Sequence, residues 1–151
     1  MKKLLITDLD DTLYDWLGYF IPSFYGMVDE IASITKINKD VLLKEFKSIH
    51  QSYGSVEYPF ATLELPSILN KYSGKSKEDI KDILGEAFHK FNSIRKRNLK
   101  LYDGVEDTLK QLFENGITII GYTESAQENG FYRLKKLGIT QYFKNIYTSE
   151  S

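Results

Sequence analysis

Apolar residues follow two different spacings along the chain, and the spacing distinguishes two kinds of element. Short aliphatic and β-branched runs at 4–6, 117–122 and 146–148 are typical of buried strands. Between the first and second runs, apolar residues recur every three or four positions, as they do on one face of a helix. The pattern predicts an α/β protein in which a helical segment is inserted between strands of one parallel sheet.

The inserted segment is expected to contain several helices. One follows the first strand directly, and a second is predicted over 39–51 with Asn38 as its N-cap. A short helix is expected around Ile68. The clearest helix begins at a capping-box sequence, 76–79, and continues as one apolar face as far as Ile94.

Two further helices are expected after the insertion, at 104–115 and 126–137. Each is followed by a glycine, which suits the left-handed backbone at a helix C-terminus. We therefore predict a discontinuous α/β core of residues 1–14 and 99–151. Residues 15–98 form the all-helical insertion.

Two carboxylates, Asp8 and Asp10, stand where the first strand ends. One carboxylate can attack phosphorus and the other can transfer a proton, provided that a divalent cation offsets their charge. A turn that opens a helix is the competing interpretation, because Asp and Thr also cap helices. The second strand ends in Thr123, which we expect beside Asp8 because parallel strands share one carboxyl edge. This pairing favours phosphate chemistry.

These segments resemble the haloacid dehalogenase (HAD) superfamily of phosphohydrolases. The run Asp8-Leu9-Asp10-Asp11-Thr12-Leu13 resembles the family's first motif, and Thr123 at the end of a hydrophobic strand resembles its second. Residues 101–105, before a helix, are similar to the usual return from cap to core. The resemblance implies a Rossmann-like HAD core with an incomplete parallel sheet of about three strands, and an inserted all-helical cap of the C1 type.

The resemblance also implies roles for individual residues. Asp8 would be the nucleophile that forms an aspartyl-phosphate, and it would also bind Mg²⁺. Asp10 would be the general acid and then the general base, with its backbone carbonyl on the metal. Thr12 would orient the Asp10 loop, and the Thr123 hydroxyl would hold a phosphoryl oxygen. Glu124 also falls among the phosphate-binding positions, where the family often has Asn. An acid there brings an anion toward the phosphate unless it turns outward.

The implied function is a Mg²⁺-dependent phosphatase acting on a small phosphorylated metabolite. The family's later lysine and its Gly-Asp-x-x-x-Asp segment have no counterpart in the sequence, and the lysines that follow Thr123 are not assigned that role. The alternative is a non-catalytic HAD-like fragment or remnant that binds a phosphorylated ligand or a protein. An incomplete sheet would also leave the first strand at an open apolar edge, which predicts self-association.

Composition narrows the possible partners and compartment. Twenty basic and 21 acidic residues give a net charge of −1, so the chain has no overall electrostatic attraction to nucleic acid. Cysteine is absent, which excludes disulfides and thiolate sites. Asp8 interrupts the first apolar run too early for a signal peptide, and no run is long enough to cross a membrane. We expect a cytoplasmic protein.

The remaining candidates have ordinary structural explanations. His50 would face a substrate under the cap or else sit at the surface near a helix C-terminus, and the second interpretation is favoured. His89 is assigned a structural role. The basic run 95–100 is assigned to a solvated helix end, where cations suit the helix dipole. For a group of aromatic residues after the first motif, packing is favoured over stacking on a base or sugar, with Tyr14, Trp16 and Tyr19 as the best exceptions. The group consists of Tyr14, Trp16, Tyr19, Phe20 and Tyr25.

Overall fold

A computed structural model describes residues 3–149, which form two units. The α/β unit contains residues 3–20 and 98–149, and the helical unit contains residues 21–97. The sequence placed the first boundary after residue 14, but the chain divides after Phe20. Tyr19 and Phe20, in the first turns of a long helix, are buried and are counted with the α/β unit.

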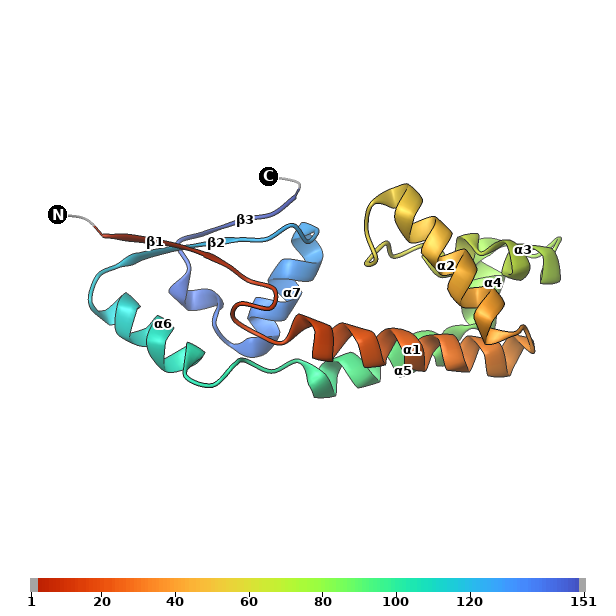
Figure 1. The fold of residues 1–151 in the computed structure, drawn as a ribbon, viewed down its shortest axis with the longest axis horizontal. Coiled ribbons are helices and arrows are strands. Elements are labelled where there is room, and N and C mark those ends of the chain that lie inside the picture. Colours follow the sequence, from red (N-terminus) through yellow and green to blue (C-terminus); the bar gives the residue numbers. More distant parts are fainter. Residues whose placement is uncertain (1–2, 150–151) are drawn as a thin grey trace. The chain divides into compact units, whose positions relative to one another are not determined.

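Three parallel strands form the sheet of the α/β unit (Figure 1). They are β1 (Leu4–Asp8), β2 (Thr118–Tyr122) and β3 (Asn145–Tyr147), in that spatial order. In register, Asp8 lies opposite Tyr122, and Tyr122 lies opposite Tyr147. The predicted number of strands and their parallel direction are confirmed, and the strands' carboxyl ends share one edge.

One face of this sheet is packed against two helices, α6 (Val105–Glu114) and α7 (Gln127–Leu137). A short 3₁₀ turn, η2 (Thr140–Tyr142), follows α7. The buried core joins sheet residues to helix residues because alternate side chains of β2 point toward the helices. Its buried members are Leu9, Leu13, Tyr14, Leu109, Ile119, Leu134 and Ile139.

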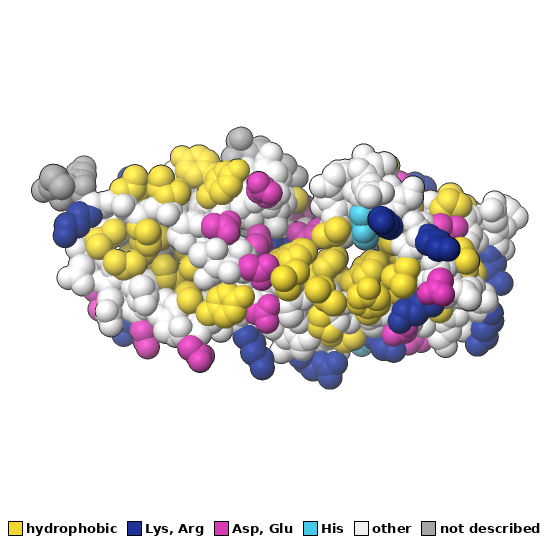
Figure 2. Space-filling view, viewed as in Figure 1, with side chains coloured by type: hydrophobic (Ala, Val, Ile, Leu, Met, Phe, Trp, Pro, Cys, Tyr) yellow, Lys and Arg dark blue, Asp and Glu magenta, His cyan; other side chains and the backbone are white. Residues whose placement is uncertain are grey.

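The opposite face of the sheet carries exposed apolar side chains. Leu4 is 57% exposed and Ile6 is 64% exposed, and both alternate with residues that face the core. Tyr122 and Tyr147 are also exposed, on the neighbouring strands in register. Figure 2 shows hydrophobic side chains at the surface of this unit. Among the described strands, β1 is at the edge of the sheet, as the sequence predicted.

The helical unit is built from helices that enclose a separate apolar core. The chain enters it along α1 (Trp16–Thr35), which begins in the α/β unit. The elements that follow are α2 (Lys39–Tyr53), η1 (Ala61–Glu64), α3 (Pro66–Lys71), α4 (Lys77–Ile83) and α5 (Gly85–Asn98). Among residues 3–149, every helix is too short or too polar to span a lipid bilayer.

Local signals explain where these helices begin. The Asn38 side chain accepts a hydrogen bond from the Asp40 N–H at 2.7 Å, which confirms the predicted N-cap. At α4, Ser76 Oγ accepts from the Asp79 N–H, and the Asp79 carboxylate accepts from the Ser76 N–H. The predicted capping box is therefore present.

The single helix predicted from the capping box to Ile94 is wrong, because the segment divides into α4 and α5. The break lies at Leu84, the C-cap of α4. Its backbone N–H donates to the carbonyl oxygens of Ile80 and Asp82. Gly85 follows, and glycine weakens a helix interior by roughly 1 kcal/mol relative to alanine. Leu84 and Ala87 remain fully buried across the break, so the continuous apolar pattern does not reveal it.

Candidate active site

The loop after β1 holds the first candidate carboxylate at the surface. The Asp8 side chain is exposed, and the Thr12 hydroxyl donates to its Oδ2 at 3.0 Å. Asp11 takes a left-handed backbone, with φ of 54°, which Asp tolerates better than most residues. Its carboxylate accepts from the N–H groups of Trp16 and Leu17, so it caps the start of α1.

The second candidate carboxylate, Asp10, accepts hydrogen bonds from four side chains. Its Oδ1 accepts from Tyr14 Oη at 2.8 Å and from Arg133 Nη1 at 2.7 Å. Its Oδ2 accepts from Thr123 Oγ1 at 2.6 Å and from Ser125 Oγ at 3.1 Å. Four donors occupy the usual acceptor directions of a carboxylate, so its rotamer and orientation are fixed.

Arg133 is the cation of this network, and its side chain has no exposed surface. Its Nη1 also donates to Ser125 Oγ at 2.9 Å, and its guanidinium lies 5.5 Å from the centre of the Tyr19 ring. A buried charge is tolerated only when it is paired and hydrogen-bonded. The ion pair between Arg133 and Asp10 therefore ties α7 to the loop after β1.

Sequence reasoning missed Arg133, although the sequence contained a usable signal. The buried positions of α7 are Gly130, Arg133 and Leu134, which follow the three- and four-residue spacing of an apolar face. Lys135 and Lys136, which follow directly, are exposed. A lone arginine at a core-facing helix position predicts a buried acidic partner, since Arg is almost never buried unpaired.

Tyr14 supplies a donor to Asp10 from a fully buried ring. Burial raises the pKa of the Tyr14 hydroxyl far above its usual value, and the nearby negative charge of Asp10 raises it further. The hydroxyl therefore stays protonated. Tyr14 belongs to the aromatic group that the sequence assigned to packing, but its hydroxyl also has a polar role.

The other predicted site residues, Thr123 and Glu124, differ in where they lie relative to these two carboxylates. Tyr122, not Thr123, lies opposite Asp8 in the sheet. The Thr123 side chain is fully buried, and its hydroxyl donates to Asp10 while accepting from the Ser125 N–H. Glu124 is exposed. Thr123 thus follows the residue that is paired with Asp8, and its hydroxyl is bonded to Asp10.

Comparison with known proteins assigns the chain to a family. The family model for haloacid dehalogenase-like hydrolases matches residues 5–151. The chain belongs to the haloacid dehalogenase-like hydrolase family. The match to this HAD family includes the run from Asp8 to Leu13. No curated protein sequence matches the chain.

Solved structures share the HAD fold at low sequence identity. One is 2-haloacid dehalogenase from Pseudomonas syringae pv. Tomato DC3000, with a TM-score of 0.65, 20% identity, and coverage of 99% of this chain and 65% of that one. Another is a haloacid dehalogenase-like family hydrolase from Xanthomonas campestris, with a TM-score of 0.60, 14% identity, and coverage of 97% and 61%.

A third similar structure contains magnesium. It is a candidate HAD-hydrolase from Bacillus subtilis bound to magnesium, with a TM-score of 0.57 and 18% identity. The match covers 99% of this chain and 66% of that one. The present chain therefore spans less than two thirds of the length of each of these HAD structures.

The donor atoms of the loop from Asp8 to Leu13 fit part of a magnesium site. No group of three acidic, histidine or cysteine side chains that could hold a metal occurs within residues 3–149. Mg²⁺ is nevertheless often bound by one or two carboxylates together with waters and substrate phosphate oxygens. The exposed Asp8 carboxylate suits such a partial donor set, whereas the Asp10 carboxylate is occupied by its four donors.

Proposed function

We propose that the chain supplies the nucleophile and the acid/base residue of a Mg²⁺-dependent phosphatase site for a small phosphorylated metabolite. One observation carries this proposal. Asp8 is exposed with a hydrogen bond from Thr12, while Asp10, two residues later, is fixed by four donors. One carboxylate is thus accessible for attack and the other is held in place, in a member of the HAD family.

The two carboxylates divide the reaction between them. An Asp8 oxygen attacks phosphorus, the bond from phosphorus to the leaving oxygen breaks, and the phosphoryl group becomes bonded to Asp8. Water then attacks that phosphorus, Asp10 accepts the proton released by the water, and Asp8 is regenerated. The same proton serves the leaving oxygen of the next substrate. For Asp10 to accept this proton, one of its four donors has to release a carboxylate oxygen.

Magnesium would be held by the Asp8 carboxylate and the Asp10 backbone carbonyl. When bound, it would supply positive charge against the phosphate oxygens and against Asp8 itself. Around it, Thr12 restrains the Asp8 carboxylate through its hydrogen bond. Thr123 would become a phosphoryl ligand only by exchanging its present bond to Asp10. The exposed Glu124 needs to stay directed outward, since a second anion near phosphate is unfavourable.

A second candidate function is a non-catalytic module that binds a phosphorylated ligand or a protein. The observation that favours it is the saturation of Asp10, which leaves Asp8 as the accessible acid of the pair. In that case Asp10 serves the fold rather than a reaction. The two functions differ in whether phosphate is released from a bound ester.

Turnover of p-nitrophenyl phosphate with Mg²⁺ tests the proposal directly. Asp8→Asn should lower the rate by roughly a thousandfold or more, because an amide is a poor nucleophile. Asp11→Asn is the matched control: it removes one charge from the same loop, but Asn also caps helices and tolerates a left-handed backbone. Its activity should be retained. A folded, Mg²⁺-loaded protein without turnover would contradict the catalytic proposal and favour the binding module.

We also propose that the chain self-associates through β1. Leu4 and Ile6 expose apolar side chains on a strand at the sheet edge, where unpaired backbone groups accept another strand. Light scattering should show a mass above that of one chain, and Ile6→Lys should return it to that of a monomer. A monomeric wild-type protein would contradict this.

A further inference from the structure

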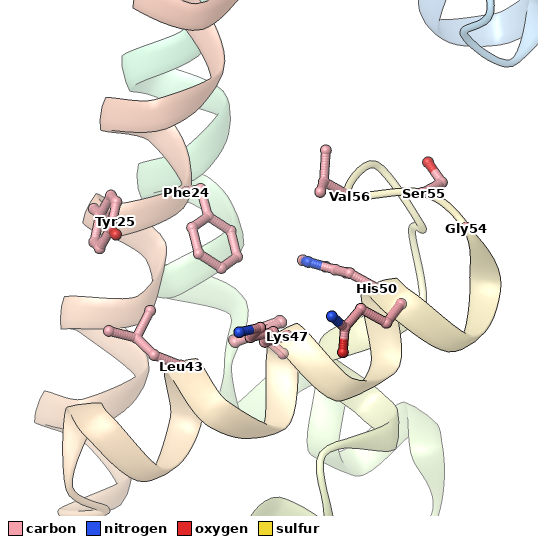
Figure 3. Close-up of a pocket in the computed structure, with 10 residues that line it drawn as sticks. Phe24, Tyr25, Leu43, Lys47, His50, Gly54, Ser55 and Val56 are labelled. Carbon is pink, nitrogen blue, oxygen red and sulfur yellow. The ribbon is translucent and has the colours of Figure 1, made fainter.

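The helical unit contains an open pocket with a volume of about 530 Å³ (Figure 3). Its walls come from α1, α2 and the loop that follows α2. The lining residues are Phe24, Tyr25, Leu43, Phe46, Lys47, His50, Gln51, Gly54, Ser55 and Val56. The volume lies within the range of typical small-molecule sites. Every lining residue belongs to the helical unit.

Most of the pocket wall is apolar, and one side of it is built from rings. The Phe24 and Phe46 rings meet edge to face with centroids 5.0 Å apart. The His50 ring lies 5.7 Å from Phe24 and 5.6 Å from Phe46. The Phe46 side chain is buried, which fixes this wall in the core. An apolar ligand would therefore meet a preformed surface rather than mobile side chains.

The polar groups of the pocket are few and lie at defined places. Figure 3 shows the His50 ring and the Lys47 side chain on the same helix, with Ser55 and Val56 on the loop beyond. Burial lowers the pKa of the His50 imidazole, so it is neutral at pH 7 and can donate or accept a hydrogen bond. His50 was placed at the surface in the favoured sequence interpretation, but it lines this pocket and is half-buried.

Charge on the pocket wall has one sign. Of the lining residues, Lys47 carries a positive charge and none is acidic. Lys44, one turn earlier on α2, is also basic and exposed, but it does not line the pocket. Glu45 is turned elsewhere, where its carboxylate accepts hydrogen bonds from Ser67. A ligand in the pocket therefore meets a cation without a competing acid among the lining side chains.

We propose that this pocket binds a small molecule with an aromatic or aliphatic body and one anionic group. The body packs against Phe24 and Phe46, and the anion is placed at Lys47. This assignment goes beyond the proposed function, because it concerns residues that take no part in the chemistry at Asp8. The charge complementarity at Lys47 selects an anion over a cation or a neutral molecule.

Binding of 1-anilinonaphthalene-8-sulfonate tests the proposal, because this probe has an aromatic body and one anionic group. Its fluorescence should report one site, and Lys47→Glu should weaken the affinity roughly tenfold by reversing the charge at that site. Lys44→Glu is the matched control, since it makes the same change on the same helix outside the pocket. Uncharged N-phenyl-1-naphthylamine should bind wild type and Lys47→Glu with similar affinity.

Histidine NMR locates the probe independently. Adding the sulfonate should shift the His50 ring resonances and leave those of His89 unchanged, since His89 is exposed and lies outside the pocket lining. The proposal is overturned if Lys47→Glu and Lys44→Glu weaken binding equally. It is also overturned if the His50 resonances do not move at saturating probe.

The same anion chemistry has two sources, a phosphate ester that the protein also hydrolyses or a separate effector. Competition between the sulfonate probe and p-nitrophenyl phosphate turnover would identify the first source. Inhibition or activation without competition would identify the second. Fluorescence and NMR do not require turnover, so a failure of the proposed phosphatase function would be distinguishable from a failure of this binding site.

Discussion

The two units of the chain bury different kinds of side chain. In the α/β unit, a charged guanidinium, a threonine hydroxyl and a tyrosine hydroxyl lie buried around one carboxylate. In the helical unit, the core is a continuous apolar cluster. Its buried members are Met27, Val28, Ile31, Leu42, Phe46, Ala61, Leu63, Leu65, Ile68, Ile80, Leu84 and Ala87.

The two units therefore build a site in two different ways, by directional hydrogen bonds and by apolar packing. Hydrogen bonds with fixed directions hold Asp10 in one position, which suits a reaction that needs atoms placed accurately. Apolar packing has no such direction, so the pocket beside Phe46 accepts ligands by shape and by a single charge. The proposed reaction therefore belongs to the α/β unit, and the proposed binding of an organic anion belongs to the helical unit.

The largest stability effect should come from breaking the polar network. Arg133→Met leaves Asp10 without its cation, and breaking a buried ion pair on one side costs roughly 3–5 kcal/mol. Urea unfolding would measure this loss. The double variant Asp10→Asn with Arg133→Met should lose less than the sum of the single variants, by about 0.5–3 kcal/mol. Additive losses would show that the two residues act separately.

A cavity in the helical core should have a similar or slightly smaller effect. Leu42→Ala removes a fully buried side chain and should cost roughly 2–5 kcal/mol. Val41→Ala is its neighbour on α2 but is 42% exposed, so it should cost much less. Urea unfolding of the pair compares the two positions. Equal losses would contradict the burial assigned to this helix.

Removing the capping box of α4 should have a smaller effect. Ser76→Ala leaves the Asp79 N–H without its side-chain acceptor and should cost about 1 kcal/mol. Ser73→Ala, at an exposed position in the turn before α4, serves as the control. Thermal unfolding followed by circular dichroism would compare them. If Ser76→Ala unfolds at the same temperature as Ser73→Ala, the capping box does not contribute to stability.

The smallest effect should be a dependence of stability on pH that comes from His50. Burial lowers the pKa of His50 in the folded state below the usual 6.5, so the unfolded chain binds more protons in that window. The contribution of neutral His50 to the free energy of unfolding is therefore fully present above pH 6.5. It is lost as the pH falls below that value. His50→Gln should reduce this decrease, whereas His89→Gln should preserve it. Urea unfolding at several pH values would show whether the two variants differ.

The fold was largely accessible from the sequence because hydrophobic spacing and caps act locally. The strand ending at Asp8, the N-cap Asn38 and the capping box at Ser76 each rest on a few neighbouring residues. The break at Leu84 was not accessible, since the apolar pattern continues across it.

The candidate site was accessible only in part. Asp8 and Asp10 follow one another in a recognisable motif, but the Arg133 partner of Asp10 is more than 100 residues away in the sequence. A local motif cannot state which helix will supply its cation. The pocket of the helical unit was not predicted for a related reason. Its walls come from α1, α2 and the loop after α2, and the sequence does not show that these segments meet.

Detection of a phosphoryl group on Asp8 tests the central claim most directly. The protein would be mixed with Mg²⁺ and p-nitrophenyl phosphate, quenched in acid, digested and analysed by mass spectrometry. The account predicts that the peptide containing Asp8 gains the mass of one phosphoryl group, and that the gain disappears in Asp8→Asn but persists in Asp11→Asn. Turnover without phosphorylation of Asp8, or phosphorylation at another residue, would contradict it.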